Sequence, residues 1–485
     1  MFFSKKIYYV SNRKLITLLL AFALLVLLIP LIINSFHDMN IITNNPSLYH
    51  IRIAEDILEG DFLGGTDELT YFKRPMYVSF FHYFLSGSIW FLGNTFTLIV
   101  FPILMGLFSI IALYLLLERL HVDKKILVLT ISLLIASPVF VFTFSTLNAY
   151  AFIATFLLWG LYFYSRDELW GLITSLVLFV LVSFFSRFSI ILLLAFLLSY
   201  SLITSKKQKW FLVVLFTLLL VGFKFVPQMF FEFDTIQETN ALVDFVSDFG
   251  GVVGFSIFAL VLGTIGLFTS WAQKRQKYPL YLLLIILIYM AIDVNKSFNI
   301  YLLFLASYLA AIGLLRILKI KWHFTILRDL TLIIILCGLL FSTVSYYDRL
   351  AQNDYSDEAA VLNWLSTNTP EDSSVLSHYQ NGFLIQTLGK RKAVLDPLSA
   401  YNIGFDQTND EMNQIFDSRN LRDTKALLKK YKIDYIFINE QMRRGSVWDE
   451  DDQGLLFLLQ NNETFKKAHS VSGVNLYRVV IRPKI

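Results

Sequence analysis

Residues 330–360 read LTLIIILCGLLFSTVSYYDRLAQNDYSDEAA, and this stretch marks the largest change of character along the chain. Before it, apolar runs alternate with short basic loops; after it, the chain has the mixed composition of a water-soluble protein. Apolar runs of about twenty residues are long enough to cross a bilayer. The sequence therefore predicts a polytopic α-helical membrane domain over residues 1–346, followed by a soluble α/β domain over residues 347–485.

The overall composition supports this division. Hydrophobic residues make up 56% of the chain and charged residues only 16%, whereas soluble proteins carry about 25% charged residues. The single cysteine, Cys337, excludes an intramolecular disulfide. Runs near the bilayer-crossing length give about eleven candidate spans: 15–34, 96–117, 126–143, 149–164, 169–185, 188–204, 210–226, 251–271, 279–293, 298–315 and 327–346.

The positions of lysine and arginine predict the orientation of these spans. Loops rich in these residues stay in the cytoplasm, and such loops alternate along the chain, starting with the amino terminus. The apolar stretch Met76–Leu92 must then lie at the membrane surface, because a crossing there would place every later basic loop outside. We therefore expect a multi-pass plasma-membrane protein with a cytoplasmic amino terminus, a large first external loop (35–95) and an extracytoplasmic carboxy-terminal domain.

The first external loop carries a helix signal. Asn45 and Pro46 suit a helix start, and Gly60 suits a helix end. Apolar and charged residues between them fall on different faces, which predicts an amphipathic helix on the membrane whose charges, Arg52 among them, are mostly solvated or bound to lipid headgroups. Asp38, just beyond the first span, could hold a divalent cation or accept a proton.

The carboxy-terminal region alternates predicted strands with predicted helices. Val375–Leu376, Ala393–Leu395, Asp434–Ile438 and Val474–Val480 have the apolar, β-branched and aromatic content of strands. Strands that alternate with helices favour an α/β domain with some parallel pairing. The region contains no Gly-rich phosphate loop and no metal-ligand spacing.

Three pieces of sequence carry a family resemblance when they are taken in order. They are the helix Tyr49–Gly60 followed by Asp67 and Arg74-Pro75, the motif Thr235-Ile236-Gln237-Glu238, and the stretch Val375–Asp396 around Gly382. Together they resemble the GT-C membrane glycosyltransferases, most closely the catalytic subunits of archaeal and bacterial oligosaccharyltransferases. The resemblance implies a lipid-phosphate-linked sugar donor, a divalent metal and a site on the outer face of the membrane.

The chain also departs from that family's pattern. Neither Asn45 nor Pro46 is acidic where the family's first metal aspartate is expected, and Asn148 and Tyr150 stand where an acidic pair is expected. His378–Asn381 replaces the Trp-Trp-Asp-Tyr of the signature that grips the Ser or Thr of a glycosylation sequon. These residues therefore do not support sequon recognition or a metal site of the family's kind.

Three cations near the predicted outer ends of spans run against the usual charge bias: Arg187, Lys224 and Lys296. A membrane-buried arginine is costly without an anion, and its planar fork suits phosphate. Arg187 and Lys296 are therefore candidate ligands of a lipid phosphate. The alternative is that these side chains only reach the lipid headgroups.

The remaining candidate residues lie in the external loops. Asp38 and Glu238 are candidates for catalysis and for binding Mg²⁺ or Mn²⁺, since carboxylate oxygens suit both ions. The resemblance implies that Glu238 helps to hold the acceptor. Tyr379 and Gln380 are candidate acceptor contacts; the alternative is that their loop only caps a helix under the sheet.

Two functions from different classes fit these observations. The first is a membrane glycosyltransferase that moves a sugar or glycan from a polyprenyl-phosphate carrier to a protein, lipid or envelope-polymer acceptor. The second is a non-catalytic relative that binds lipid-linked glycans or scaffolds envelope assembly, which the non-acidic Pro46, Asn148 and Tyr150 favour. We favour the enzyme, with bilayer lipids as its surroundings and no nucleic-acid partner.

Overall fold

The computed structural model describes residues 12–36, 45–60, 65–76, 78–166, 168–185, 187–204, 215, 243, 245–251, 253–271, 274–294, 296–351, 355–401 and 404–480. The chain divides into two compact units. The first takes its described residues from Met1–His37, Ser79–Phe233 and Glu238–Gln352, and the second from Asp38–Val78 and Asn353–Ile485.

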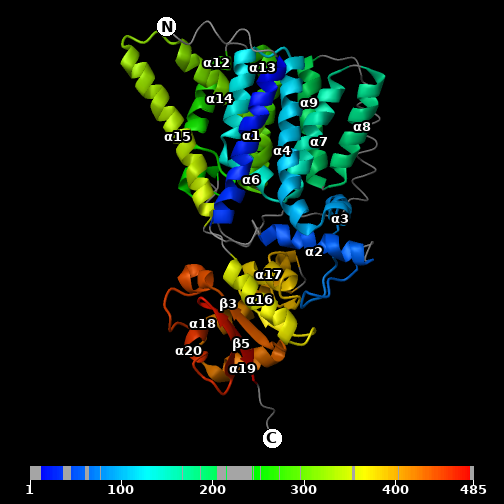
Figure 1. Ribbon diagram of the computed structural model, residues 1–485, viewed down its shortest axis with the longest axis vertical. Helices are drawn as coiled ribbons and strands as arrows, with labels where there is room; N and C mark the ends of the chain where they lie inside the picture. Colours follow the sequence, from blue (N-terminus) through cyan, green and yellow to red (C-terminus); the bar gives the residue numbers. More distant parts are fainter. Residues whose placement is uncertain are drawn as a thin grey trace. The chain divides into compact units, whose positions relative to one another are not determined.

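The first unit is a helical bundle, most of whose helices run side by side in Figure 1. The strongly apolar composition of its segments leaves the backbone to bond within each helix, as a bilayer requires. Its described helices are α1 (Asn12–Phe36), α3 (Phe80–Leu92), α4 (Asn94–Arg119), α5 (Lys124–Ile135), α6 (Pro138–Ser145), α7 (Ala149–Tyr164), α8 (Leu169–Ser183), α9 (Arg187–Thr204), α12 (Ile257–Ser270), α13 (Lys274–Tyr289), α14 (Asn299–Lys319) and α15 (Thr325–Ala351).

Within the described residues, four helices are long and apolar enough to cross a membrane: Asn12–Ile33, Asn94–Arg119, Asn299–Lys319 and Thr325–Arg349. Helices α5 and α6 give a fifth candidate, bent by 64°. The bend falls at Pro138, the first residue of α6, because proline cannot continue the preceding helix's hydrogen bonding. The bundle fits a multi-pass membrane protein, but the described residues do not confirm the predicted count of about eleven spans.

Glycine allows helices α12 and α14 to approach at backbone distance. A Cβ atom added to Gly266 would lie 1.8 Å from the carbonyl oxygen of Leu309, and one added to Gly313 would lie 2.0 Å from that of Leu262. Small residues at such crossings are what drive helix association where there is no hydrophobic gain from leaving water. This contact therefore needs glycine on both helices.

The second unit contains a five-stranded sheet in the order β2-β1-β3-β5-β4. Strand β1 pairs in parallel with both β2 and β3, whereas β5 pairs antiparallel with β3 and β4. The sheet has the parallel pairing that the sequence predicts. Its strands are β1 (Ser374–Leu376), β2 (Lys392–Ala393), β3 (Tyr435–Ile438), β4 (Phe465–Val471) and β5 (Val474–Val479).

Side-chain alternation along β3 builds one hydrophobic core on each face of this sheet. Tyr435 and Phe437 belong to one core, and Ile436 and Ile438 to the other, as the two-residue period of a strand requires. The helices of the unit are α2 (Asn45–Glu59), α16 (Ser356–Asn368), α17 (Gly382–Thr387), α18 (Phe405–Asp417), α19 (Leu421–Lys430) and α20 (Leu455–Leu458). Residues of α16 and α17 enter the first core, and residues of α18, α19 and α20 enter the second.

Helix α2 belongs to this second unit although it lies some 300 residues before the sheet in sequence. Leu48 is buried in the same core as α16 and α17. The ring of Tyr49 packs against that of Phe383 in α17, with centroids 5.0 Å apart. The segment that follows α2 also pairs with β2, through the backbone bond from Ala393 N to Leu69 O at 3.0 Å.

The glycine contact gives a direct test of the bundle. Gly266→Ala should destabilise the protein by about 1–3 kcal/mol, the usual cost of overpacking, because the new methyl group meets backbone atoms that cannot move aside. The matched control is Gly263→Ala on the same helix, where the nearest atom to the new Cβ is 3.9 Å away. Thermal unfolding in detergent measures both; equal melting temperatures for the two variants would contradict the contact.

Candidate functional site

The parallel strands place several polar residues at one edge of the sheet. Strands β2, β1 and β3 run in the same direction, so their carboxyl ends lie together. The connection from β1 to β2 runs through α17 on one face, and that from β2 to β3 runs through α18 and α19 on the other. Ligand sites in such sheets lie outside the carboxyl ends of the strands, at the point where the winding reverses.

The loop after β1 is the predicted acceptor loop, and the buried side-chain amides of Asn381 and Asn439 hold it in place. Asn381 donates from Nδ2 to Ser377 Oγ at 2.9 Å. Asn439, which directly follows β3, donates from Nδ2 to Asn381 Oδ1 at 3.2 Å and accepts from Met442 N at 3.2 Å. The loops after β1 and β3 are therefore joined at the point where the winding reverses.

The side chains of this loop are uncharged at neutral pH. Burial lowers the pKa of His378 to about 4, so its ring is neutral, and its centroid lies 4.3 Å from that of Tyr379. Burial also raises the pKa of the Tyr379 phenol, which accepts a hydrogen bond from Gln380 Nε2 at 3.5 Å. The half-buried pair Tyr379 and Gln380 can thus recognise a partner by neutral hydrogen bonds and ring contact, without an ion pair.

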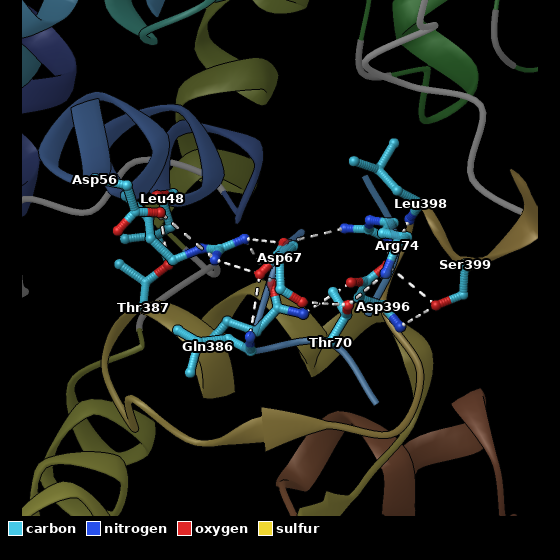
Figure 2. Close-up of polar contacts among 12 residues, drawn as sticks. Leu48, Asp56, Asp67, Thr70, Arg74, Gln386, Thr387, Asp396, Leu398 and Ser399 are labelled. Carbon is cyan, nitrogen blue, oxygen red and sulfur yellow. Dashed lines mark hydrogen bonds and ion pairs between the residues drawn. The ribbon is translucent and has the colours of Figure 1, made fainter. Parts of the chain in front are cut away.

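A buried cluster of charges joins the 45–76 segment to the loop after β2, as Figure 2 shows. Arg52 of α2 donates to both carboxylate oxygens of Asp67, at 2.8 and 2.7 Å. Arg74 donates to Asp396, which lies three residues beyond β2. Gln386 of α17 connects the two pairs, since it accepts from Arg52 at 3.3 Å and donates to Asp396 at 2.7 Å.

The cluster is neutral overall, because two arginines face two aspartates, and all four side chains are at least 95% buried. Burial opposes the ionisation of Asp396, but Arg74, Gln386 and Ser399 outweigh it and hold the pKa of this carboxyl below its usual value. A buried pair is stable only when additional hydrogen bonds complete it. Here backbone N–H groups do so: Leu398 N donates to Asp396 and Leu69 N donates to Asp67.

A cavity of about 190 Å³ opens beside this cluster. Its lining is mainly acidic: Arg52, Asp56, Glu59, Thr66, Asp67, Glu68, Leu69 and Met76. Burial, together with Asp67, Glu59 and Glu55, raises the pKa of Asp56 to about 6, although Arg52 opposes the shift. Asp56 therefore changes charge close to neutral pH.

The predicted site residues have different outcomes. Tyr379 and Gln380 lie in the loop after β1, at the sheet edge described above. Arg187 and Lys296 begin α9 and the 3₁₀ turn Lys296–Phe298 in the first unit, and their side chains lie outside the described residues. Asp38 and Glu238 also lie outside them.

The sequence did not identify the roles of the charge cluster. Asp67, Arg74 and Asp396 were all part of the family resemblance, so that resemblance was the available signal. Arg52 was predicted among solvated charges, but it is 4% exposed and bonded to Asp67. Its partner comes from a turn 15 residues away, which helical periodicity cannot indicate.

The whole chain is similar in fold to two kinds of solved membrane transferase. The oligosaccharyltransferase of Archaeoglobus fulgidus in its apo form aligns with a TM-score of 0.64 and 15% identity, over 97% of this chain and 75% of that one. The chain therefore has a fold like that of this oligosaccharyltransferase. The same archaeal protein, AglB, in complex with an inhibitory peptide and a dolichol-phosphate, aligns with a TM-score of 0.64 and 12% identity, over 97% and 74%.

The second kind is ArnT of Cupriavidus metallidurans bound to undecaprenyl phosphate, with a TM-score of 0.54 and 11% identity over 96% of this chain and 98% of that one. No family model matches the sequence, and no curated protein matches it. The resemblance drawn from the sequence is therefore confirmed as a likeness in fold.

The described residues do not fit a metal site by themselves. One structure of the archaeal oligosaccharyltransferase contains zinc and sulfate. In this chain, no three His, Cys, Asp or Glu side chains among the described residues are grouped so that they could hold a metal ion.

Because Arg74 belongs to the buried charge cluster, replacing it should destabilise the protein much more than replacing its neighbour Lys73. Arg74→Ala should cost about 3–5 kcal/mol, because it leaves Asp396 buried without its partner. Lys73→Ala is the matched control: Lys73 pairs with Glu68, but both side chains are about 60% exposed, and such pairs contribute about 0–1 kcal/mol. Thermal unfolding of both variants decides the matter, and similar losses would contradict a structural role for the cluster.

Replacing Asp56 by asparagine should stabilise the folded protein in a pH-dependent way. Its pKa in the folded chain, about 6, lies above the ordinary value of 3.8, so the folded state loses stability as pH rises through this interval. Asp56→Asn should therefore melt like the unmodified chain near pH 4 and be stabilised near pH 8, by up to roughly 3 kcal/mol. Glu68→Gln, at an exposed carboxyl of the same cavity, should give no such gain; an unchanged pH profile for Asp56→Asn would refute the shift.

Proposed function

We propose that this protein is a membrane glycosyltransferase that moves a sugar or glycan from a polyprenyl-phosphate carrier to an acceptor on the outer face of the membrane. The observation that carries the proposal is the extent of the fold likeness. It covers 97% of the chain against an oligosaccharyltransferase and 96% against a protein that binds undecaprenyl phosphate. Membrane bundle and soluble domain are both included in that likeness, so the proposal concerns the whole chain.

The donor would be held by cations of the first unit. Arg187 and Lys296 begin helical segments, α9 and the turn before α14. Charges at such positions are costly in a membrane unless an anion accompanies them. A phosphate of the lipid carrier would supply that anion, with the arginine giving two parallel hydrogen bonds.

The acceptor would be held at the carboxyl edge of the sheet in the second unit. Tyr379 and Gln380 lie in a loop that Asn381 and Asn439 anchor. Because this loop is neutral at pH 7, it suits hydroxyl and amide groups of an acceptor better than charged groups. The acceptor would be a protein, a lipid or an envelope polymer that presents such groups.

The reacting groups would be carboxylates of the external loops. Asp38 or Glu238 would accept the proton of the acceptor, a role that typically contributes about 10²–10⁴-fold to rate. The same two residues are the proposed ligands of Mg²⁺ or Mn²⁺, ions that favour oxygen ligands. Sidedness follows from the charge bias: the amino terminus in the cytoplasm and the second unit outside.

One observation favours the non-catalytic alternative, in which the protein binds lipid-linked glycans or scaffolds envelope assembly. Asn148 stands where the family has an acidic residue, and it is used entirely as a helix cap. Its Oδ1 accepts from Ala151 N at 2.9 Å, and its Nδ2 donates to the carbonyl oxygens of Thr143 and Thr146, both at 3.0 Å. The buried side chain therefore serves as a helix cap, and its neutral amide lacks the charge with which a carboxylate would bind a metal ion.

Transfer of a labelled glycan separates the two functions. Membranes that contain the chain should transfer label from an undecaprenyl-linked donor, and Glu238→Gln or Arg187→Ala should reduce the rate by about 10²-fold or more. Chelation of divalent cations should also reduce transfer. Retained activity in both variants would contradict the roles proposed for Glu238 and Arg187. Absence of transfer would count against the enzyme, and binding of donor with neither transfer nor metal dependence would support the alternative. Lys73→Ala, at an exposed position, is the control that should leave transfer unchanged.

A further inference from the structure

The outer end of the last predicted span carries an arginine that is hydrogen-bonded to neutral groups, although the charge of nearby Asp248 also acts on it. Arg349 lies near the end of α15. It donates from Nη1 to the carbonyl oxygen of Ser247 at 2.7 Å and from Nη2 to Ser247 Oγ at 2.8 Å. Both acceptors are neutral, and no ion pair joins Arg349 to a carboxylate in the part of the chain that the structure describes.

Two buried polar atoms at this position have no hydrogen-bond partner among the described residues: Arg349 Nε and the hydroxyl of Tyr346. Tyr346 lies three residues earlier, on the same face of the helix, and it is 1% exposed. Its ring lies under the guanidinium, with the Arg349 carbon Cζ 5.9 Å from the ring centroid. Arg349 Nε can only donate and the Tyr346 hydroxyl can donate, so an acceptor would satisfy both, and next to a guanidinium with no carboxylate bonded to it that acceptor is best an anion.

Neighbouring contacts hold this end of α15 rigidly. Tyr347 donates from its hydroxyl to the carbonyl oxygen of Val26 in α1 at 2.9 Å, and Thr343 donates to that of Ala136 at 2.6 Å. The guanidinium is thus fixed between Ser247 and Tyr346, yet part of its side chain remains exposed. A site fixed before its ligand arrives loses less entropy on binding.

The connection that contains Ser247 and Val253 contacts both Arg349 and the start of α14. Ser247 accepts from Arg349, and Asn299 donates from Nδ2 to the carbonyl oxygen of Val253 at 2.8 Å. Asn299 is the first residue of α14 and follows the turn that begins at Lys296. Arg349 and the candidate phosphate ligand Lys296 are therefore at the same end of the bundle, joined by one loop.

We infer that Arg349 and Tyr346 form a binding position for the phosphate group of a lipid at the outer membrane surface. The guanidinium supplies the charge and Nε, and the phenol supplies a second donor. That the lipid is the polyprenyl-phosphate donor, and not a bulk anionic phospholipid, rests on the proposed function. The chemistry of recognition is the same in both cases.

Titration of the full-length chain in neutral detergent tests this inference, with the melting temperature as the readout. Undecaprenyl phosphate should raise the melting temperature, whereas uncharged undecaprenol should not. Arg349→Gln should weaken the apparent affinity by about 10- to 100-fold, the usual effect of losing a charge-assisted hydrogen bond. Arg349→Lys should recover part of it, because the charge is kept, and Tyr346→Phe should give a smaller loss.

The controls separate binding from folding. Arg328→Gln removes an exposed arginine from the opposite end of the same helix and should leave affinity unchanged. Ser247→Ala removes only the anchoring hydroxyl, so it tests whether lost anchoring by itself reduces affinity. Equal affinity of Arg349→Gln and the unmodified chain would overturn the inference while leaving the proposed function intact.

Other outcomes distinguish the source of the phosphate. If phosphatidylglycerol binds through Arg349 as tightly as undecaprenyl phosphate, the position serves bulk headgroups and its assignment to the donor is overturned. If Arg349-dependent phosphate binding is found without any glycan transfer, the inference stands and the proposed enzymatic function fails. Absence of binding by the unmodified chain overturns the inference.

Discussion

The second unit depends on one buried, electrically balanced cluster. Arg52, Asp67, Arg74 and Asp396 are all removed from water, which would be prohibitive for any one of them without its partner. Three of these residues come from the 45–76 segment and the fourth from the loop after β2, so the cluster forms only when segments far apart in sequence are assembled. Gln386 of α17 links the two ion pairs and fixes their relative position. The 45–76 segment is thereby part of the second unit's structure, not an independent loop.

This arrangement places the candidate acceptor loop on a rigid support. Asp396 follows β2, Asn381 follows β1 and Asn439 follows β3, so the polar residues of three parallel strands gather at one edge. Two of the three positions are used to hold the loops: Asn381 and Asn439 bond each other. Tyr379 and Gln380, which directly precede Asn381, are half-buried at that edge. Rigid elements that present a short polar loop are the usual way in which an α/β domain builds a binding site.

Sequence patterns predicted the features that depend on local periodicity and composition. The division between apolar and polar regions, the parallel strands and the helix Asn45–Glu59 all follow from such patterns, and the family resemblance anticipated the fold. Contacts between distant residues could not be predicted: Arg52 was placed on a solvated face because the pattern contains no information about Asp67 in a later turn. For the same reason, the sequence did not indicate a binding role for Arg349, because that role depends on its contacts with both Ser247 and Tyr346. Asp38 and Glu238 stay predictions, since they lie outside the described residues.

Because the cluster joins the 45–76 segment to the carboxy-terminal domain, both must lie on the same side of the membrane. We propose that this side is the outside. Single cysteines test this directly in a Cys337→Ser background: Glu59→Cys and Glu440→Cys lie at exposed positions of the two segments, and Lys319→Cys lies at an exposed position expected in the cytoplasm. In intact cells, a membrane-impermeant maleimide should label the first two and should label the third only after permeabilisation. Labelling of Glu59→Cys and Glu440→Cys from opposite sides, or protection of both in intact cells, would contradict the account.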